Sequence, residues 1–340
     1  YLFLLIYIFY IIWVGGDVLK VYRFFVPVIP VLYLLFVLSL RELIMMQFRR
    51  KIAPAVGGAV ILLICTGTAA GSYLLSKEHI ESYLRLERLL TEKMQFTAGM
   101  LKKYMGPDFS VAASTVGILG YELPGHRVID LLGLTDKYIA RHPEKISGLQ
   151  STWQERHFNS RYILEQHPDF ILFSTNDKPS APAELALMLH SEFRRCYSLT
   201  AFPASKKGNW SLIHKRWKVI DMDRDVTLKS ADFALEYKKG CDERSNGNYN
   251  KALDAFNSAA RLLPDKYSSL ESSIGDILCR MGRYDESIPY LQQAAQLDSK
   301  NWNAFYMLGM VAAKKGDTVT ARNLWYEIYK FAPWVGDRGQ

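Results

Sequence analysis

Three charged side chains lie in a short stretch between two strongly apolar runs near the start of the chain. The stretch VGGDVLKVYRFFVPVIP contains Asp17, Lys20 and Arg23. Charge at the edge of a membrane is costly unless it pairs, caps a helix or takes part in function. The planar fork of Arg23 suits a phosphate, with Lys20 as a second cation and Asp17 as a supporting residue. The structural alternative is that Gly15 and Gly16 end one helix, Asp17 caps the next segment and Arg23 reaches the lipid headgroups.

A second group of candidate residues follows much later, in VGILGYELPGHRVIDLLGLTDKYIAR. Asp136 begins DKYIARH, at a position where an aspartate caps a helix, and Asp130 ends an apolar strand where it would hydrogen-bond a turn. We expect Gly133 to supply a backbone angle that is closed to other residues. Arg141 ends the stretch. This pattern favours structural roles for these residues, with binding of an acceptor substrate as the alternative.

The elements that must position these residues begin with membrane helices. Residues 24–40 and 52–75 carry no charge, and each is long enough to cross a hydrocarbon core of about 30 Å. The opening YLFLLIYIFYIIWV is typical of the end of another span. It lacks the basic start of a signal peptide. We therefore expect residues 1–76 to be transmembrane helices, the C-terminal part of a larger membrane domain.

The orientation follows from the loop that joins the two complete spans. Arg41, Arg49, Arg50 and Lys51 lie in it, and short positive loops stay in the cytoplasm. Residues 77–340 then lie outside the cytoplasm. The expected location is the bacterial inner membrane, with several spans and a large periplasmic part.

Residues 77–107 and 108–228 predict a connecting helix and a small α/β domain. Apolar residues recur at helical spacing up to the Gly106-Pro107 breaker, and we expect this amphipathic helix to pack on the domain that follows. Short apolar strands then alternate with helices, including one helix over 183–196, which indicates a mainly parallel sheet. Such a sheet could bind a ligand at its strand ends. No glycine-rich phosphate loop is present, so no nucleotide site is predicted.

Residues 229–335 contain three copies of one pattern. Gly240, Gly275 and Gly309 begin equivalent stretches, and a second glycine follows seven residues later in each. The array resembles tetratricopeptide repeats, whose period is about 34 residues. Small residues would let the two helices of one unit approach closely, while large ones fill the gap to the next unit. The repeats predict a binding surface for a protein partner.

Composition excludes some classes of function. The net charge of +8 is spread along the chain, without the basic stripe that nucleic acid requires. The four cysteines show no disulfide or metal spacing. We expect buried free thiols, with a bridge between Cys241 and Cys279 as the alternative. No cofactor or divalent metal is indicated.

Two of these stretches resemble one enzyme family. GGDVLKVYRFFVPVIP is similar to the GGD-x(5)-R-F-x-x-P-x-x-P signature of bacterial GT-C glycosyltransferases, which include the terminal arabinofuranosyltransferases of mycobacterial cell walls. The later stretch resembles the G-x-x-x-Y…V-x-D-x-x-G-L-x-D-x-x-x-A-R motif of that group. The matching positions are Gly117, Tyr121, Asp130, Gly133, Leu134, Asp136, Ala140 and Arg141. The resemblance covers roughly residues 1–175.

This resemblance implies transfer of a sugar from a polyprenyl-phosphate donor to a cell-envelope glycan or other extracytoplasmic acceptor. Arg23 and Lys20 would bind the donor phosphate, while Asp130, Asp136 and Arg141 would bind the acceptor or support the fold. The catalytic base of such enzymes lies in an early loop, which is expected upstream of Tyr1, so Asp17 would only support it. The sequence leaves a second function open: a non-catalytic, membrane-anchored repeat scaffold for an envelope assembly complex.

Overall fold

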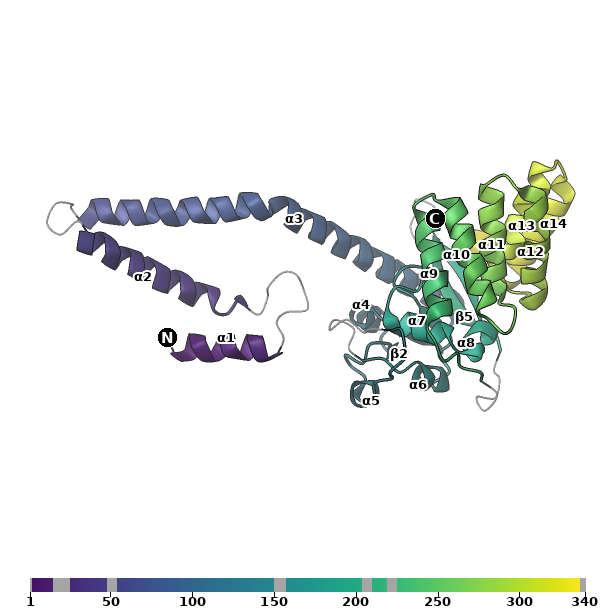
Figure 1. Ribbon diagram of the computed structural model, residues 1–340, viewed down its shortest axis with the longest axis horizontal. Coiled ribbons are helices and arrows are strands. Elements are labelled where there is room, and N and C mark those ends of the chain that lie inside the picture. Colours follow the sequence, from purple (N-terminus) through teal and green to yellow (C-terminus); the bar gives the residue numbers. More distant parts are fainter. Residues whose placement is uncertain are drawn as a thin grey trace. The chain divides into compact units, whose positions relative to one another are not determined.

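The computed structural model describes residues 2–14, 25–47, 54–149, 157–203, 210–218 and 225–336. The chain forms two compact units, Tyr1–Leu89 and Leu90–Gln340. Figure 1 shows the order of the helices and strands along the chain.

The first unit contains α1 (Leu2–Val14), α2 (Ile29–Gln47) and the first part of α3 (Pro54–Met105). Most apolar side chains of α1 and of the span within α3 are exposed, for example Trp13 and Leu63. Within the described ranges, one helix, Gly58–Met105, is long and apolar enough to cross a membrane, and Leu2–Trp13 is a shorter apolar helix. The several spans expected from the sequence therefore stay a prediction.

The connecting helix is not separate from the last span, because α3 is continuous across both. It ends at Met105, and Gly106 follows with a φ of +76°, as the Gly-Pro breaker predicts. The residues from Leu90 onward belong to the second unit, where Met94, Ala98 and Leu101 are fully buried. The predicted packing of the apolar stripe on the following domain is thus confirmed for this end of the helix.

A five-stranded sheet forms the centre of the second unit. Its strands are β1 (Ser110–Ala113), β2 (Arg127–Asp130), β3 (Phe170–Leu172), β4 (Tyr197–Pro203) and β5 (Trp210–Arg216), in the order β2-β1-β3-β5-β4. β1 pairs with β2 and β3 in parallel, whereas β5 pairs antiparallel with β3 and β4. The sheet is therefore mixed and not mainly parallel. The difference arises from β4, which the sequence analysis did not predict and which forms a hairpin with β5.

Five short helices accompany these strands. They are α4 (Val116–Glu122), α5 (Lys137–Arg141), α6 (Ser160–Glu165), α7 (Pro182–Met188) and α8 (Ser191–Cys196). The single helix predicted over 183–196 is thus two helices. The break occurs at Leu189 and His190, whose backbone leaves the helix to meet a returning segment: Leu228 N donates to Leu189 O at 3.0 Å, and Ser191 N donates to Val226 O at 3.1 Å.

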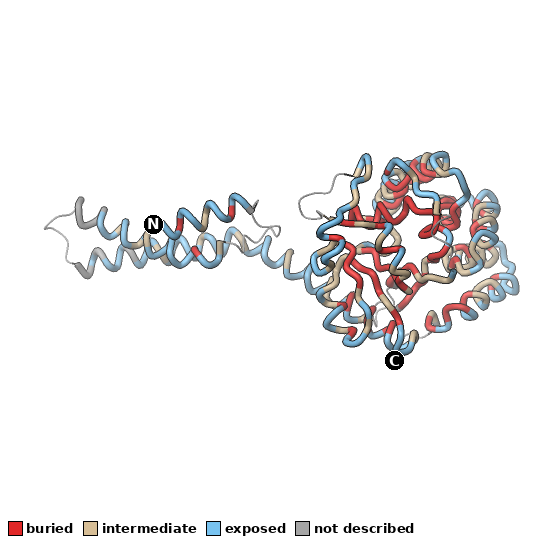
Figure 2. Tube along the Cα trace, turned by 90° about the horizontal axis from the view of Figure 1, so that it is seen from below, coloured by how far each residue is buried: buried red, intermediate tan, exposed pale blue. Residues whose placement is uncertain are grey.

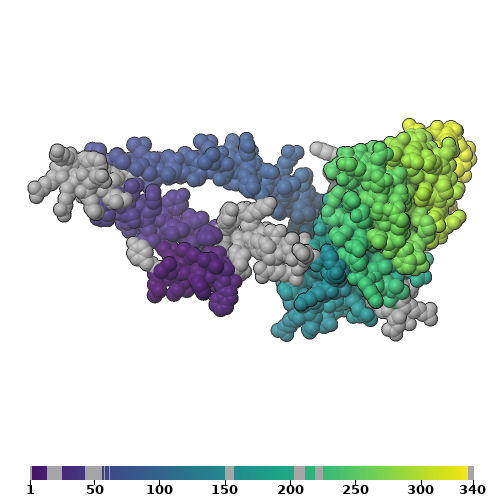
Figure 3. All heavy atoms as spheres, viewed as in Figure 1, coloured from purple at the N-terminus to yellow at the C-terminus, as the bar shows by residue number. Residues whose placement is uncertain are grey.

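The C-terminal helices form three antiparallel pairs. They are α9 (Asp232–Ser245) with α10 (Tyr249–Arg261), α11 (Ser268–Arg280) with α12 (Tyr284–Leu297), and α13 (Trp302–Lys314) with α14 (Thr318–Phe331). A short 3₁₀ helix, η3 (Pro333–Gly336), follows. In Figure 3 the surface of these residues passes from green to yellow in sequence order.

Alternate residues of each strand pack on opposite faces of the sheet. On one face, Ala112 and Ile171 belong to a hydrophobic cluster that includes Phe256 of α10 and Ile274 of α11. On the other face, Val111 and Leu172 belong to a cluster shared with α3, α14 and η3. Figure 2 shows the buried strands enclosed by helices. The boundary predicted at residues 228 and 229 stays a prediction, but the core packing crosses it.

Candidate protein-interaction site

Each repeat is closed by a glycine of its first helix against a large side chain of its second. A Cβ at Gly240 would lie 2.5 Å from the ring of Phe256, and one at Gly275 would lie 2.5 Å from Cδ2 of Leu291. Gly309 meets Trp325 in the same way. The close approach within each unit is therefore as predicted. The large side chains, however, lie over the glycine of their own unit.

The first helices of the repeats, α9, α11 and α13, turn one side toward the sheet, and we call this side the inner face. Tyr237 of α9, Ser273 of α11 and Trp302 of α13 line a cavity of about 280 Å³ whose opposite wall is Leu199 of β4 and Leu212 of β5. Tetratricopeptide arrays usually offer this concave side to ligands. Here the edge of the protein's own sheet occupies it.

Ion pairs hold the loop after β3 to the inner face. Asp177 Oδ2 lies 2.6 Å from Arg244 Nη2, and Lys178 Nζ lies 2.8 Å from Asp242 Oδ1. Burial alone would lower the pKa of Arg244, but the Asp177 carboxylate raises it above its usual value. The Asp177 and Arg244 side chains are each only 16% exposed, so this pair is costly to separate. The two ion pairs therefore tie the loop after β3 to α9.

η3 closes the same edge from the far end of the array. Trp334 Nε1 donates to Ala201 O at 2.9 Å, and its ring stacks on Phe202 with centroids 4.9 Å apart. β4 is one of the two edge strands of the sheet, and an uncovered edge strand invites pairing with other chains. η3 satisfies one backbone carbonyl of this edge.

The opposite side of the second and third repeats carries an open groove of about 580 Å³, which we call the outer groove. It lies between α12, α13 and α14, with an apolar floor that includes Leu308 and Val311. Gln292 and Gln296 of α12 are exposed along it. An apolar floor with a polar rim is the form that receives the apolar face of an amphipathic helix.

The carboxylates predicted in the α/β domain make structural contacts. Asp130 is buried and accepts hydrogen bonds from Leu132 N at 2.8 Å and from Thr135 N at 2.6 Å. Asp136 caps α5, accepting from Tyr138 N at 2.8 Å and from Ile139 N at 3.0 Å. Both contacts are those of the structural interpretation, and acceptor binding stays a prediction.

The glycine of the same motif is required by the backbone. Gly133 has a φ of +66°, and a Cβ there would lie 2.8 Å from Cγ2 of Ile139, so the predicted conformation is confirmed. Arg141 is exposed at the end of α5, while Tyr121 and Leu134 are 83% and 74% exposed. Asp17, Lys20 and Arg23 lie outside the described residues.

The carboxyl ends of β1 and β3, where a ligand was expected, are filled by Glu184 of α7. Its carboxylate is fully buried and accepts from Ser174 N at 2.7 Å and Ser174 Oγ at 2.8 Å. It also accepts from Ser180 N at 2.7 Å. Because the Glu184 carboxylate accepts all of these hydrogen bonds, the ends of the strands hold the start of α7 in position.

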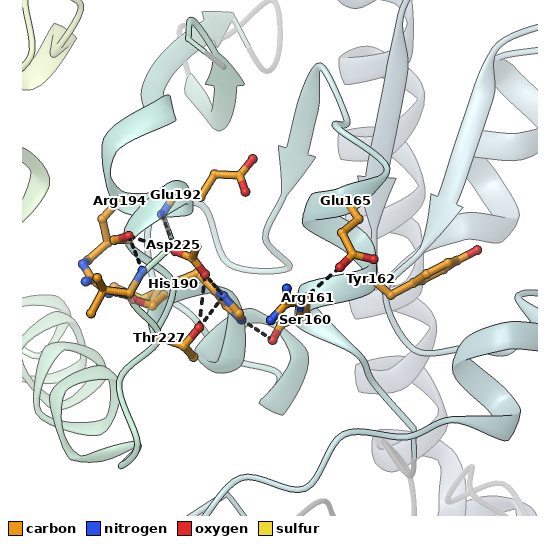
Figure 4. A network of polar contacts seen from close by, with 12 residues as sticks. Ser160, Arg161, Tyr162, Glu165, His190, Glu192, Arg194, Asp225 and Thr227 are labelled. Atoms are coloured by element: carbon orange, nitrogen blue, oxygen red, sulfur yellow. Dashed lines mark hydrogen bonds and ion pairs between the residues drawn. The ribbon is translucent and has the colours of Figure 1, made fainter. Parts of the chain in front are cut away.

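A buried network around His190 has the residue types of a catalytic triad (Figure 4). His190 Nδ1 lies 2.6 Å from Asp225 Oδ2, and His190 Nε2 lies 2.8 Å from Ser160 Oγ. Ser160 is only 2% exposed. Its single hydroxyl proton is directed to Glu144 Oε2 at 2.6 Å, so that proton is not shared with His190 Nε2. A serine held in this way is not a free nucleophile, and the network is a cross-link.

Glu192 of α8 lies beside this network with both carboxylate oxygens buried and without a hydrogen bond. The imidazole of His167 lies next to it, with 3.6 Å between Nδ1 and Glu192 Oε1. Burial raises the pKa of Glu192 to about 7, and the Asp225 carboxylate adds to the effect. This carboxyl group therefore changes charge near neutral pH.

The sequence analysis did not identify His190, Asp225, Glu144 or Ser160 as partners, because they are far apart in the chain. The strand β4 could have been predicted from its pattern. Tyr197, Leu199 and Ala201 occupy every second position there, with polar residues and then Phe202 between and after them. In the part of the chain that the structure describes, no group of three metal-ligating side chains occurs. All four cysteines are free.

Comparison with known proteins agrees with the repeat architecture. The family "Tetratricopeptide repeat" (TPR_16) matches residues 273–334, so the C-terminal region contains tetratricopeptide repeats. The family "Domain of unknown function (DUF8728)" matches residues 84–235, which is less than half of the chain. That second match covers the end of α3, the sheet and the start of α9.

Individual relatives are also similar to the chain over limited lengths. Photosystem I assembly protein Ycf3 of Acaryochloris marina is 29% identical over 102 residues, which are 29% of this chain and 59% of that protein. The translocator chaperone SycD of Yersinia enterocolitica type III secretion is 21% identical over 31% of this chain and 80% of its own, with a TM-score of 0.29. YrrB, "a TPR protein with an unusual peptide-binding site", is 24% identical over 31% of this chain and 54% of its own, with a TM-score of 0.28.

Proposed function

We propose that the chain is a membrane-anchored tetratricopeptide-repeat scaffold that holds a protein partner in its outer groove. The observation that carries the proposal is the contrast between the two sides of the array. The inner face is covered by β4 and β5, with a cavity of about 280 Å³ between them, whereas the outer groove is open and has an apolar floor. An amphipathic helix of the partner would place its apolar face on Leu308 and Val311.

The proposal also includes a cellular location and a biological process for the scaffold. We propose a bacterial inner membrane as the location of the scaffold, because exposed apolar helices precede the folded unit. The proposed periplasmic side for residues 77–340 rests on the positive loop that contains Arg41, Arg49, Arg50 and Lys51. Assembly of an envelope complex is the proposed process. The name of the Acaryochloris marina relative, an assembly protein, is in keeping with such a role.

Glycosyl transfer from a polyprenyl-phosphate donor stays a prediction from the sequence. It rests on Asp17, Lys20 and Arg23 and on a base expected upstream of Tyr1. The variant Arg23→Ala distinguishes the two functions. If the chain is a transferase, this variant abolishes sugar transfer; if the chain is a scaffold, the variant still binds the protein partner as before.

Site-specific photo-crosslinking tests the outer groove in living cells. A benzophenone amino acid at Gln292 or Gln296 of the full chain is expected to give a discrete heavier adduct with one protein. The matched control is the same amino acid at Lys239, an exposed position on α9, from which no such adduct is expected. The substitution Leu308→Arg places a charge in the apolar floor and should abolish the adduct. Equal labelling from all three positions, or no adduct, would contradict the proposal.

A further inference from the structure

A second cleft, of about 450 Å³, lies between the α/β domain and the ends of the first two repeats. Arg194 and Arg195 of α8 line one side, and Lys218, just after β5, lies beside them. Asp265 and Lys266, from the loop between α10 and α11, line another side. The cleft is thus built by segments that are distant in the sequence, and polar groups dominate its walls.

Arg194 is the buried cation of this cleft. It is 9% exposed, donates from Nη1 to Met188 O at 2.8 Å and lies over the ring of Phe233 with 5.8 Å between Cζ and the centroid. These contacts fix the guanidinium plane without neutralising its charge. Among the residues with described positions, no carboxylate forms an ion pair with it.

The surrounding charges leave the cleft positive. Four cations line it against two carboxylates, Asp265 and Asp298, and Lys266 is already paired with Glu271 at 3.0 Å. Burial lowers the pKa of Arg194, and Tyr267, Asp225 and Asp265 offset this only in part. A buried charge without a partner is expensive, so a ligand that supplies the opposite charge would be bound well.

We propose that this cleft binds an oxyanion, a phosphate or carboxylate group, with the Arg194 guanidinium as its main partner and Arg195 and Lys218 at its rim. The guanidinium keeps free N–H groups beyond the one that Met188 uses, and its planar fork fits two oxygens of one anion. The oxyanion could be a free small anion or an acidic side chain of a protein. This cleft is distinct from the outer groove, so the proposal does not rest on the proposed function.

Isothermal titration of the full chain in detergent tests the cleft with two probes, inorganic phosphate and a hexaglutamate peptide. We expect at least one to bind, and Arg194→Lys, which keeps the charge but loses the fork, to weaken that binding at least tenfold. The matched control is Arg322→Gln, which removes an exposed arginine of α14 and should leave the affinity unchanged. Tighter binding of phosphate identifies a free anion as the source, and tighter binding of the peptide identifies acidic side chains.

A second variant keeps the test decisive if Arg194→Lys does not fold. The double substitution Arg195→Gln and Lys218→Gln alters only the rim and should weaken binding several-fold, with a shallower dependence of affinity on salt. Failure of both probes to bind the unmodified chain would overturn the proposal. Equal affinity of the rim variant, Arg322→Gln and the unmodified chain would also overturn it.

Discussion

At the residue scale, the most informative group is the buried cross-link of Ser160, His190 and Asp225. These side chains have the identities of a hydrolytic triad, and His190 lies within 2.8 Å of each of the other two. The Ser160 hydroxyl donates its hydrogen bond to Glu144 Oε2. His190 thus lies between the Ser160 hydroxyl and the Asp225 carboxylate, and it joins α6, the break between α7 and α8, and the segment that begins at residue 225.

Removal of His190 should be strongly destabilising. His190→Ala takes one hydrogen-bond partner from the buried Asp225 carboxylate and one from Ser160, and leaving a buried polar group unsatisfied costs about 1–3 kcal/mol. The measurement is the free energy of unfolding by urea at pH 7. His142→Ala, at an exposed histidine, is the control and should change it by less than about 0.5 kcal/mol. Similar values for both variants would contradict the cross-link.

The same network predicts loss of stability in acid. Burial would raise the pKa of Asp225, but hydrogen bonds from His190 and from the Glu192 amide hold it well below its usual value. A lowered pKa stabilises the folded state above the unfolded pKa of about 4, and this contribution is lost as the pH falls further.

Glu192 should give the opposite dependence on pH. Its folded pKa of about 7 lies above the unfolded value, so the folded chain keeps a proton that the unfolded chain releases. The free energy of unfolding therefore falls as the pH rises from about 4.5 to 7. The groups that face Glu192 are Asp225, His190, Arg216, Glu165 and His167.

The variant Glu192→Gln tests this assignment. It should remove the decline between pH 5 and 7 and be more stable than the parent at pH 8, by at most roughly 3 kcal/mol. Urea unfolding of both proteins at several pH values measures the difference. Parallel curves for the two proteins would show that Glu192 is not the titrating group.

At the element scale, the glycine of each first helix determines how closely the two helices of a repeat pack. Gly275 meets Leu291 of α12, and each equivalent pair is separated by the same number of residues. A different kind of glycine ends each first helix: Gly247, Gly282 and Gly316 have φ values of +77°, +76° and +84°. Each repeat therefore contains two glycines with different roles: one allows the two helices to pack closely, and the other adopts a positive φ after the first helix.

A methyl group at Gly275 should force α11 and α12 apart. Gly275→Ala is expected to cost about 1–3 kcal/mol through overpacking against Leu291. Leu291→Ala alone also destabilises by leaving a cavity, but the double variant should be more stable than the sum of the two predicts. A double-mutant cycle by urea unfolding measures this coupling. Simple additivity would mean that the two residues do not oppose each other.

At the scale of the whole molecule, the repeats and the sheet share their cores. One face of the sheet packs on Phe256 and Ile274, and the other packs on Phe331 and Trp334. The array therefore acts as the outer layer of the α/β domain as well as a repeat stack. This arrangement explains why its inner face is not free for a partner.

Deletion of residues 229–340 should consequently unfold the sheet. The sequence alone favours an α/β domain that folds independently, but the truncated chain would expose both faces of the sheet and the edge strand β4. We expect loss of the cooperative thermal transition seen by near-ultraviolet circular dichroism. Deletion of only residues 337–340 serves as the control. A cooperative transition in the long deletion would show that the two parts fold separately.

Local features of this protein were determined by the sequence itself. The glycine spacing predicts the repeats, Gly106 ends α3, and Asp136 caps α5, because helix ends, turns and close helix contacts depend on residues near one another in the chain. Only the tertiary structure decided that β4 occupies the inner face, that His190 meets Ser160 and Asp225, and that Arg194 lines a cleft. Those contacts join residues that are distant in sequence, and periodicity records which face of an element is buried but not what buries it.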